Sequence, residues 1–156
     1  MSDYYDLYLA VDLSPDISEP ALQEVRWLLG QAEMPSAPSS ADWKTWGYTW
    51  QVFAGGSASH AFDGADVSLL VPAVDRPGGD GGVPWALTVR TCVHEDEFGV
   101  VMEVVDWLLR HASTRGWAGF VRDTASADIQ HIVRHDGGFD LVDVRSAEKR
   151  FQIAWT

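Results

Sequence analysis

A chain of 156 residues is long enough for one globular domain and too short for two of ordinary size. Its composition, 46% hydrophobic and 22% charged, is that of a globular protein and not of a disordered one. With 23 acidic and 11 basic side chains, its formal net charge is -12, which argues against a protein that binds nucleic acid or an anionic membrane surface. We therefore expect a single acidic domain over residues 1–156.

The cysteine count and the hydropathy pattern bear on the compartment. Cys92 has no second cysteine with which to form an intrachain disulfide, and this suits a reducing compartment. No segment reaches the roughly 20 apolar residues that a membrane helix needs, and the first residues are acidic where a signal peptide would be basic. These features predict a cytoplasmic protein that does not contact a membrane.

Helices and strands are expected from the spacing of apolar residues and from the turn residues between them. Runs rich in β-branched and aromatic residues predict strands, and apolar residues that recur every three or four positions predict helices. Gly137 and Gly138 are interpreted as the end of a short helix. The expected order is a strand at 4–13, a helix from Ser18 or Glu19 to about Gly30, strands at about 45–54, 66–74 and 85–93, a helix at about 97–112, a strand near 117–122, a short helix near 125–135, and strands near 139–144 and 150–155.

This order predicts an α+β fold. We expect a mostly antiparallel sheet of about six to seven strands, with the two main helices on one face. The core would be ferredoxin-like, extended by extra strands and a short third helix. Residues 25–32 and 105–112 share a Val, a Trp, two Leu and an Ala in register. Duplication of a strand–helix unit and chance similarity between two amphipathic helices both explain this match.

Two tryptophans lie away from the apolar stripes of the main helices. On a helical wheel Trp107 is about 160° from the middle of its stripe, among Asp96, Glu103 and Asp106. Trp27 is placed similarly on the first helix. Either each ring packs against a neighbouring helix or loop, or the rings form a contact surface, since tryptophan is enriched at binding hot spots. These five residues are the candidate partner-binding site.

A pocket for a flat or apolar ligand is the second candidate site. The chain has eight tryptophans, and such dense aromatics usually fill a core. Trp50 and Trp85 could instead line a pocket, with the glycine-rich loop at 76–84 as its lid. The sequence contains no phosphate loop, no Gly-x-Gly-x-x-Gly, no Gly-x-Ser-x-Gly and no Cys-x-x-Cys pattern. We therefore predict no cofactor and no named catalytic residue, and the pattern leans towards a protein that is not an enzyme.

Metal binding was considered at the predicted short helix. Asp128, His131 and His135 would share one face of that helix, and two histidines one turn apart can chelate zinc. The spacing alone is weak, because no His-Glu-x-x-His pattern is present and histidines are common at exposed helix ends. We predict no metal site.

The leading hypothesis is a non-catalytic, acidic interaction module that binds another protein, in particular a basic one. Small inhibitors and immunity-type proteins that neutralise a toxin or nuclease have this profile. Strong negative charge would steer such a partner and raise its association rate. One alternative is a small-molecule-binding or enzymatic α+β domain with an aromatic pocket near the 76–84 loop. Another is a homodimer formed through the face of Trp27 and Trp107.

Overall fold

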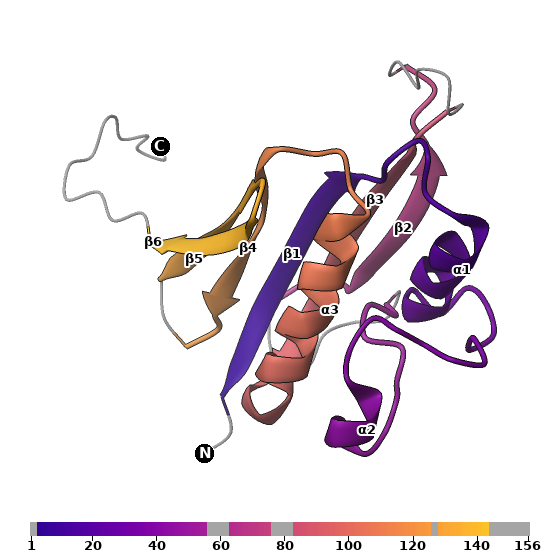
Figure 1. Cartoon of the computed structure of the whole chain (residues 1–156). Coiled ribbons are helices and arrows are strands. Elements are labelled where there is room, and N and C mark those ends of the chain that lie inside the picture. The colour runs from indigo at the N-terminus through magenta and orange to yellow at the C-terminus, as the bar shows by residue number, and fades with distance from the viewer. Residues whose placement is uncertain (1–2, 56–62, 76–82, 126–127, 144–156) are drawn as a thin grey trace.

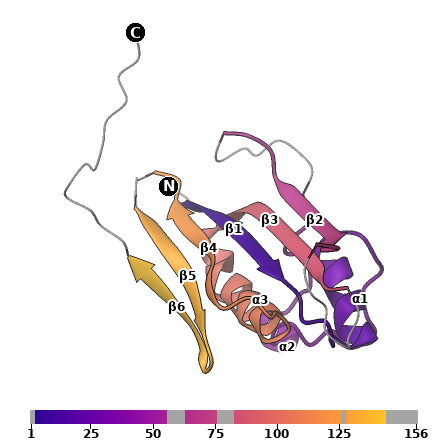
Figure 2. The ribbon, with the colours of Figure 1, turned by 90° about the horizontal axis from the view of Figure 1, so that it is seen from above.

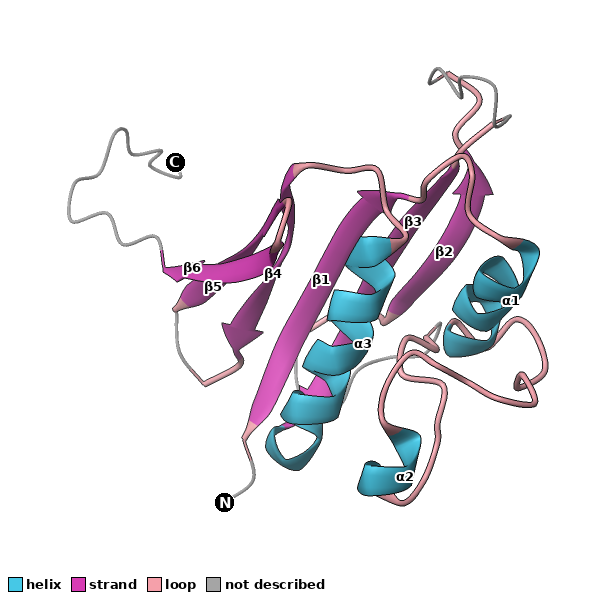
Figure 3. Ribbon diagram, viewed as in Figure 1, coloured by secondary structure: helices cyan, strands magenta, loops and turns pink. Residues whose placement is uncertain are grey.

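The computed structural model describes residues 3–55, 63–75, 83–125 and 128–143 (Figure 1). Within these residues a six-stranded sheet is covered by helices, as the ribbon coloured by secondary structure shows (Figure 3). In chain order the elements are β1 (Tyr4–Asp12), α1 (Glu19–Leu28), α2 (Trp43–Trp46), β2 (Val67–Pro72), β3 (Trp85–His94), the 3-10 turn η2 (Glu95–Glu97), α3 (Phe98–Arg110), β4 (Gly116–Asp123), β5 (Ile129–His135) and β6 (Gly138–Asp143).

The strands lie in the order β2-β3-β1-β4-β5-β6, and every neighbouring pair is antiparallel. The chain passes through α1 between β1 and β2, and through α3 between β3 and β4. Each of these connections therefore steps over one strand of the sheet, and the helices lie on the same face (Figure 2). The α+β prediction is confirmed, while the ferredoxin-like assignment of the core stays a prediction. No helix among the described residues is long and apolar enough to cross a membrane.

The core lies between the sheet and its helices. On β1, alternate residues Leu7, Leu9 and Val11 are buried beneath the helices, as the two-residue period of a strand requires. The buried residues of α3 are Val100, Val101, Val104, Val105, Leu108 and Leu109. Val100 and Val104 are both 0% exposed, and Met102 is only partly buried. Because Val100 and Val104 belong to the buried face, Trp107 lies at the edge of that face and not opposite to it.

The strand expected at 45–54 is wrong. Residues 43–46 form the short helix α2, and the chain after it is irregular. Asp42 caps the helix, because its side chain accepts a hydrogen bond from the Thr45 amide, and Gly47 ends it in a left-handed conformation with φ of 82°. These cap residues outweigh the β propensity of the tryptophans around them.

The short helix expected near 125–135 is also wrong. Residues 129–135 form β5, which pairs with β4 on one side and with β6 on the other. Ile132 is fully buried, and its β-branched neighbours suit a strand. Gly137 belongs to the two-residue connection between the paired residues His135 and Gly138, so the glycines mark a hairpin and not a helix end. The strand expected at 150–155 lies outside the described residues.

The opposite face of the sheet is not covered by any described helix (Figure 2). At its centre Asp6, 2% exposed, accepts hydrogen bonds from two arginines. Arg90 donates through Nε and Nη2, at 3.3 Å each, and Arg122 donates through Nη2 at 3.2 Å. Two guanidinium groups thus compensate one buried carboxylate and tie together the three central strands β3, β1 and β4.

Candidate interaction groove on α3

The face of α3 that points away from the sheet is the floor of an open groove of about 490 Å³. One wall is the loop of residues 39–42, which leads into α2, and the other is Phe139 at the start of β6. From α3 itself the lining residues are Gly99, Met102, Glu103, Asp106, Trp107 and Arg110. Three elements that are far apart in the sequence thus build the groove.

The loop wall is held first by a buried carboxylate of α1. Glu24 is 4% exposed, and it accepts hydrogen bonds from the amides of Ser39 at 2.7 Å and Ser40 at 2.9 Å. The Ser39 hydroxyl donates a third bond, at 3.1 Å. A buried carboxylate needs such donors to offset its lost hydration, so this contact fixes the loop against α1.

A carboxylate of α3 also binds the loop of residues 39–42. Glu103 accepts one hydrogen bond from the Asp42 amide at 3.0 Å and another from the Trp46 indole N–H at 3.1 Å. Asp42 in turn accepts from the Thr45 hydroxyl at 2.7 Å. Glu103, a predicted partner-binding residue, therefore also docks α2 onto α3.

The groove carries negative charge that is not neutralised by nearby cations. Asp106 forms an ion pair with Arg110, with 2.6 Å between its Oδ2 and the arginine Nη2. Among the described residues, no cation lies within ion-pair distance of Asp42 or Glu103. A carboxylate has about four acceptor positions, so each of these two groups can still accept from a guest.

Apolar surface flanks these charges. Met102, Trp107 and Phe139 pack against the core but are only partly buried. The Trp107 ring lies edge-on to the imidazole of His111, with 4.7 Å between centroids. Burial lowers the pKa of His111 from its usual 6.5 and so favours the neutral imidazole, and the electrostatic influence of the Glu24 carboxylate opposes this more weakly.

The structure brings together three of the five residues predicted to bind a partner. Glu103, Asp106 and Trp107 all line the groove. Trp27 does not line it, because it is 4% exposed and packs edge-to-face against Trp43 at 5.8 Å, as the packing alternative expected. Asp96 is exposed in η2, and its amide donates to His94 Nδ1, away from the groove lining.

Trp50 and Trp85, which were predicted to line the alternative aromatic pocket, contact different residues. The Trp50 ring contacts those of Tyr48 at 5.1 Å and Trp43 at 5.8 Å. The Trp85 ring faces the guanidinium of Arg26, whose central carbon Cζ lies 5.1 Å from the ring centroid. Residues 76–82 of the expected lid lie outside the described residues, so this pocket stays a prediction.

The histidines considered for metal binding lie on a strand and not on a helix. His131 accepts a hydrogen bond from the Trp117 indole at 2.9 Å, and His135 accepts one from the Gly137 amide at 3.2 Å. Four strand positions separate their Cα atoms by about 13 Å, too far for the chelation that a helix would allow. Nowhere in the described ranges do three His, Cys, Asp or Glu residues approach closely enough to hold a metal ion.

Asp42 and Phe139 are among the lining residues that were not predicted from the sequence. Asp42 carried a usable signal, because aspartate is a favoured N-cap residue at the start of a helix. Phe139 carried none, because only the β5–β6 hairpin brings it beside α3.

Comparison with known proteins gives no match: no protein-family model, no curated protein and no solved structure is similar to this chain. The fold class by itself is compatible with many activities. The function is therefore argued from the groove.

Proposed function

We propose that this protein is a non-catalytic interaction module whose α3 groove binds a basic segment of another protein. The observation that carries the proposal is the pairing of two carboxylates, Asp42 and Glu103, with the partly exposed apolar side chains of Met102, Trp107 and Phe139. Aromatic residues are enriched at the centre of protein interfaces, and polar and charged residues form the rim around them.

An arginine or lysine side chain fits this lining chemically. Its aliphatic stem can lie on the Trp107 ring, and its cationic head can then reach the free acceptor positions of Glu103 and Asp42. Both carboxylates are held in place by hydrogen bonds from the protein, so a guest meets acceptors in fixed positions. The net charge of -12 adds a long-range attraction for a basic partner.

Site-specific photo-cross-linking tests the proposal. p-Benzoylphenylalanine is placed at position 107 and, as a matched control, at position 117, another partly exposed tryptophan that lies on the helix-free sheet face. We expect position 107 to capture a basic protein that position 117 does not capture. The captured protein is then produced in pure form, and its association with the wild-type chain is measured by interferometry over a range of NaCl concentrations.

For the pure pair we expect an association rate that falls as NaCl is raised, because charge steering is screened. Trp107→Ala should weaken the affinity by about tenfold or more, as hot-spot truncations do. Equal capture from both positions, or an affinity unchanged by Trp107→Ala, would contradict the proposal. A cross-linked product of twice the chain mass would point instead to a homodimer through this face.

A further inference from the structure

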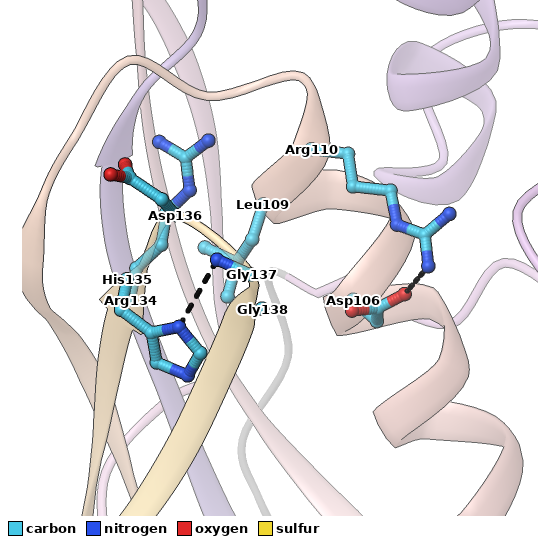
Figure 4. A pocket seen from close by; sticks show the side chains of 8 residues that line it. All are labelled: Asp106, Leu109, Arg110, Arg134, His135, Asp136, Gly137 and Gly138. Atoms are coloured by element: carbon cyan, nitrogen blue, oxygen red, sulfur yellow. Dashed lines mark hydrogen bonds and ion pairs between the residues drawn. The ribbon is translucent and has the colours of Figure 1, made fainter.

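The groove meets a second cavity at the C-terminal end of α3. This cavity has a volume of about 290 Å³ and shares Asp106 and Arg110 with the groove. Its other lining residues are Leu109 and the segment 134–138, which includes the turn between β5 and β6 (Figure 4). A ligand lying in the groove can therefore extend into this cavity past the Asp106–Arg110 pair.

Arg134 is the cation of this cavity for which the described part of the chain offers no carboxylate within ion-pair distance. Its Nη1 donates a hydrogen bond of 2.8 Å to the carbonyl oxygen of Thr114. The two carboxylates nearby are paired elsewhere, Asp106 with Arg110 at 2.6 Å and Asp136 with Arg115 at 3.6 Å. Within the described residues, none lies within ion-pair distance of Arg134.

The electrostatic surroundings of Arg134 agree with this geometry. Desolvation lowers the pKa of Arg134, repulsion from Arg115 lowers it further, and attraction to Asp136 opposes these effects more weakly. The guanidinium stays charged at any ordinary pH. The nearby carboxylate of Asp136 therefore compensates the positive charge of Arg134 only weakly, although the chain as a whole carries a large excess of negative charge.

The groove and the cavity together form a charged axis along α3. Among the described residues, Asp42 and Glu103 at one end have no cation within ion-pair distance, and Arg134 at the other has no carboxylate within that distance. Arg110, which lines both the groove and the cavity, lies seven helix positions from Glu103, or about 10 Å along the axis of α3, and Arg134 belongs to the cavity beyond it. An extended peptide covers about 3.3 Å per residue, so a peptide needs at least about three residues to reach the cavity from Glu103.

We propose that the partner segment also carries a carboxylate, which binds Arg134 in this cavity while a basic residue at least about three positions away lies over Glu103. This inference rests on the proposed function and specifies the chemistry of the segment: it is dipolar, not uniformly basic. The carboxylate can come from an Asp or Glu side chain or from the end of a chain, and both forms match the planar fork of a guanidinium.

Defined synthetic peptides test the inference. The first probe is acetyl-Gly-Arg-Leu-Gly-Asp-Gly-amide, the second has Asn in place of Asp, and the third, acetyl-Gly-Arg-Leu-Gly, ends in a free carboxylate. Dissociation constants are measured from amide and indole NMR shifts with the wild-type chain, Arg134→Gln and Arg26→Gln. Arg26 lies on α1 beside Trp85, so its replacement is a control that removes the same charge outside the cavity.

We expect the Asp peptide to bind the wild type and Arg26→Gln about fivefold or more tightly than the Asn peptide. With Arg134→Gln this ratio should fall to about one, and with Arg134→Lys, which keeps the charge but lacks the fork, it should be intermediate. If the third probe keeps the advantage over the Asn peptide, a chain end is accepted as a source of the carboxylate.

Two results would overturn the inference, and they are distinguishable. If the ratio between the dissociation constants of the Asn and Asp peptides is the same for Arg134→Gln as for the wild type, Arg134 does not bind the carboxylate. If that occurs while all three peptides still shift the Trp107 indole signal, the proposed function stands and only the carboxylate site falls. If no peptide gives a saturable shift of any groove residue, both proposals fall. The amide spectrum of each variant shows whether it has folded.

Discussion

Glu24 on α1 and His111 at the C-terminal end of α3 interact electrostatically but have different surroundings. Glu24 accepts three hydrogen bonds from the loop of residues 39–40, and these stabilise its carboxylate. For His111 burial is the larger influence, and it lowers the pKa of the imidazole. Glu24 thus holds the loop of residues 39–40 in place, and burial makes His111 harder to protonate.

The depressed pKa of His111 predicts a loss of stability in mild acid. Because the unfolded chain binds this proton more readily than the folded chain, folding stability should fall as the pH drops through about 6.5, and the loss should level off below the folded pKa. Urea unfolding at a series of pH values measures the slope. His111→Gln should reduce the slope in this window, and an unchanged slope would contradict the assignment.

Single residues also show how far the site could be predicted from the sequence. Glu103, Asp106 and Trp107 were found because one helix places them, and helical spacing is visible in a sequence. The role of Asp42 could not be found in this way, because its amide bonds to Glu103 across 61 positions. The sequence left two alternatives open for Trp27 for a similar reason: its burial depends on Trp43, which belongs to another element.

At the scale of elements, most helices and strands were predicted, and the two errors have the same cause. Both segments, 45–54 and 125–135, carry mixed signals, in which local propensity competes with caps and turns. In the first, Asp42 and Gly47 bracket a helical turn. In the second, the hairpin at Gly137 and pairing on both sides favour a strand over the helical spacing of the histidines.

Gly119 gives a sharp prediction for β4. It lies beside a bulge in the pairing of β4 with β5, has a φ of 154°, and a Cβ there would collide with the carbonyl oxygen of Tyr8 on β1. Gly119→Ala should therefore cost about 3 kcal/mol or more in the free energy of unfolding, because backbone on the central strand must move.

The matched control is Gly116→Ala on the same strand. Gly116 also has a positive φ, 76°, but a Cβ at that position meets nothing within 4 Å. It should cost only about 1 to 2 kcal/mol, the strain of a left-handed backbone. Denaturant unfolding compares the two variants, and equal losses would show that the contact with Tyr8 is not the decisive factor.

At the scale of the whole molecule, the charge excess opposes compactness. A formal charge of -12 on a chain of 156 residues produces self-repulsion, which salt screens over a Debye length of about 10 Å at 0.1 M. The ion pairs of Arg90 and Arg122 with Asp6 are screened less, because the Asp6 carboxylate is buried.

We therefore expect added salt to stabilise the protein. The midpoint of thermal unfolding should rise by roughly a few degrees between low and moderate NaCl. An equal rise in KCl would separate screening from the binding of one particular cation. A fall in the midpoint would show that screened surface ion pairs contribute more to stability than the relief of repulsion does.

The double attachment of residues 39–42 has a consequence for how quickly and how tightly a ligand can associate. This segment is fastened to α1 through Glu24 and to α3 through Glu103, so its backbone is already ordered before anything binds. Immobilising a free loop would subtract from the affinity, and waiting for it to close would slow the encounter. Because residues 39–42 are ordered beforehand, the conformational entropy of this segment is lost when the protein folds and not when the ligand binds.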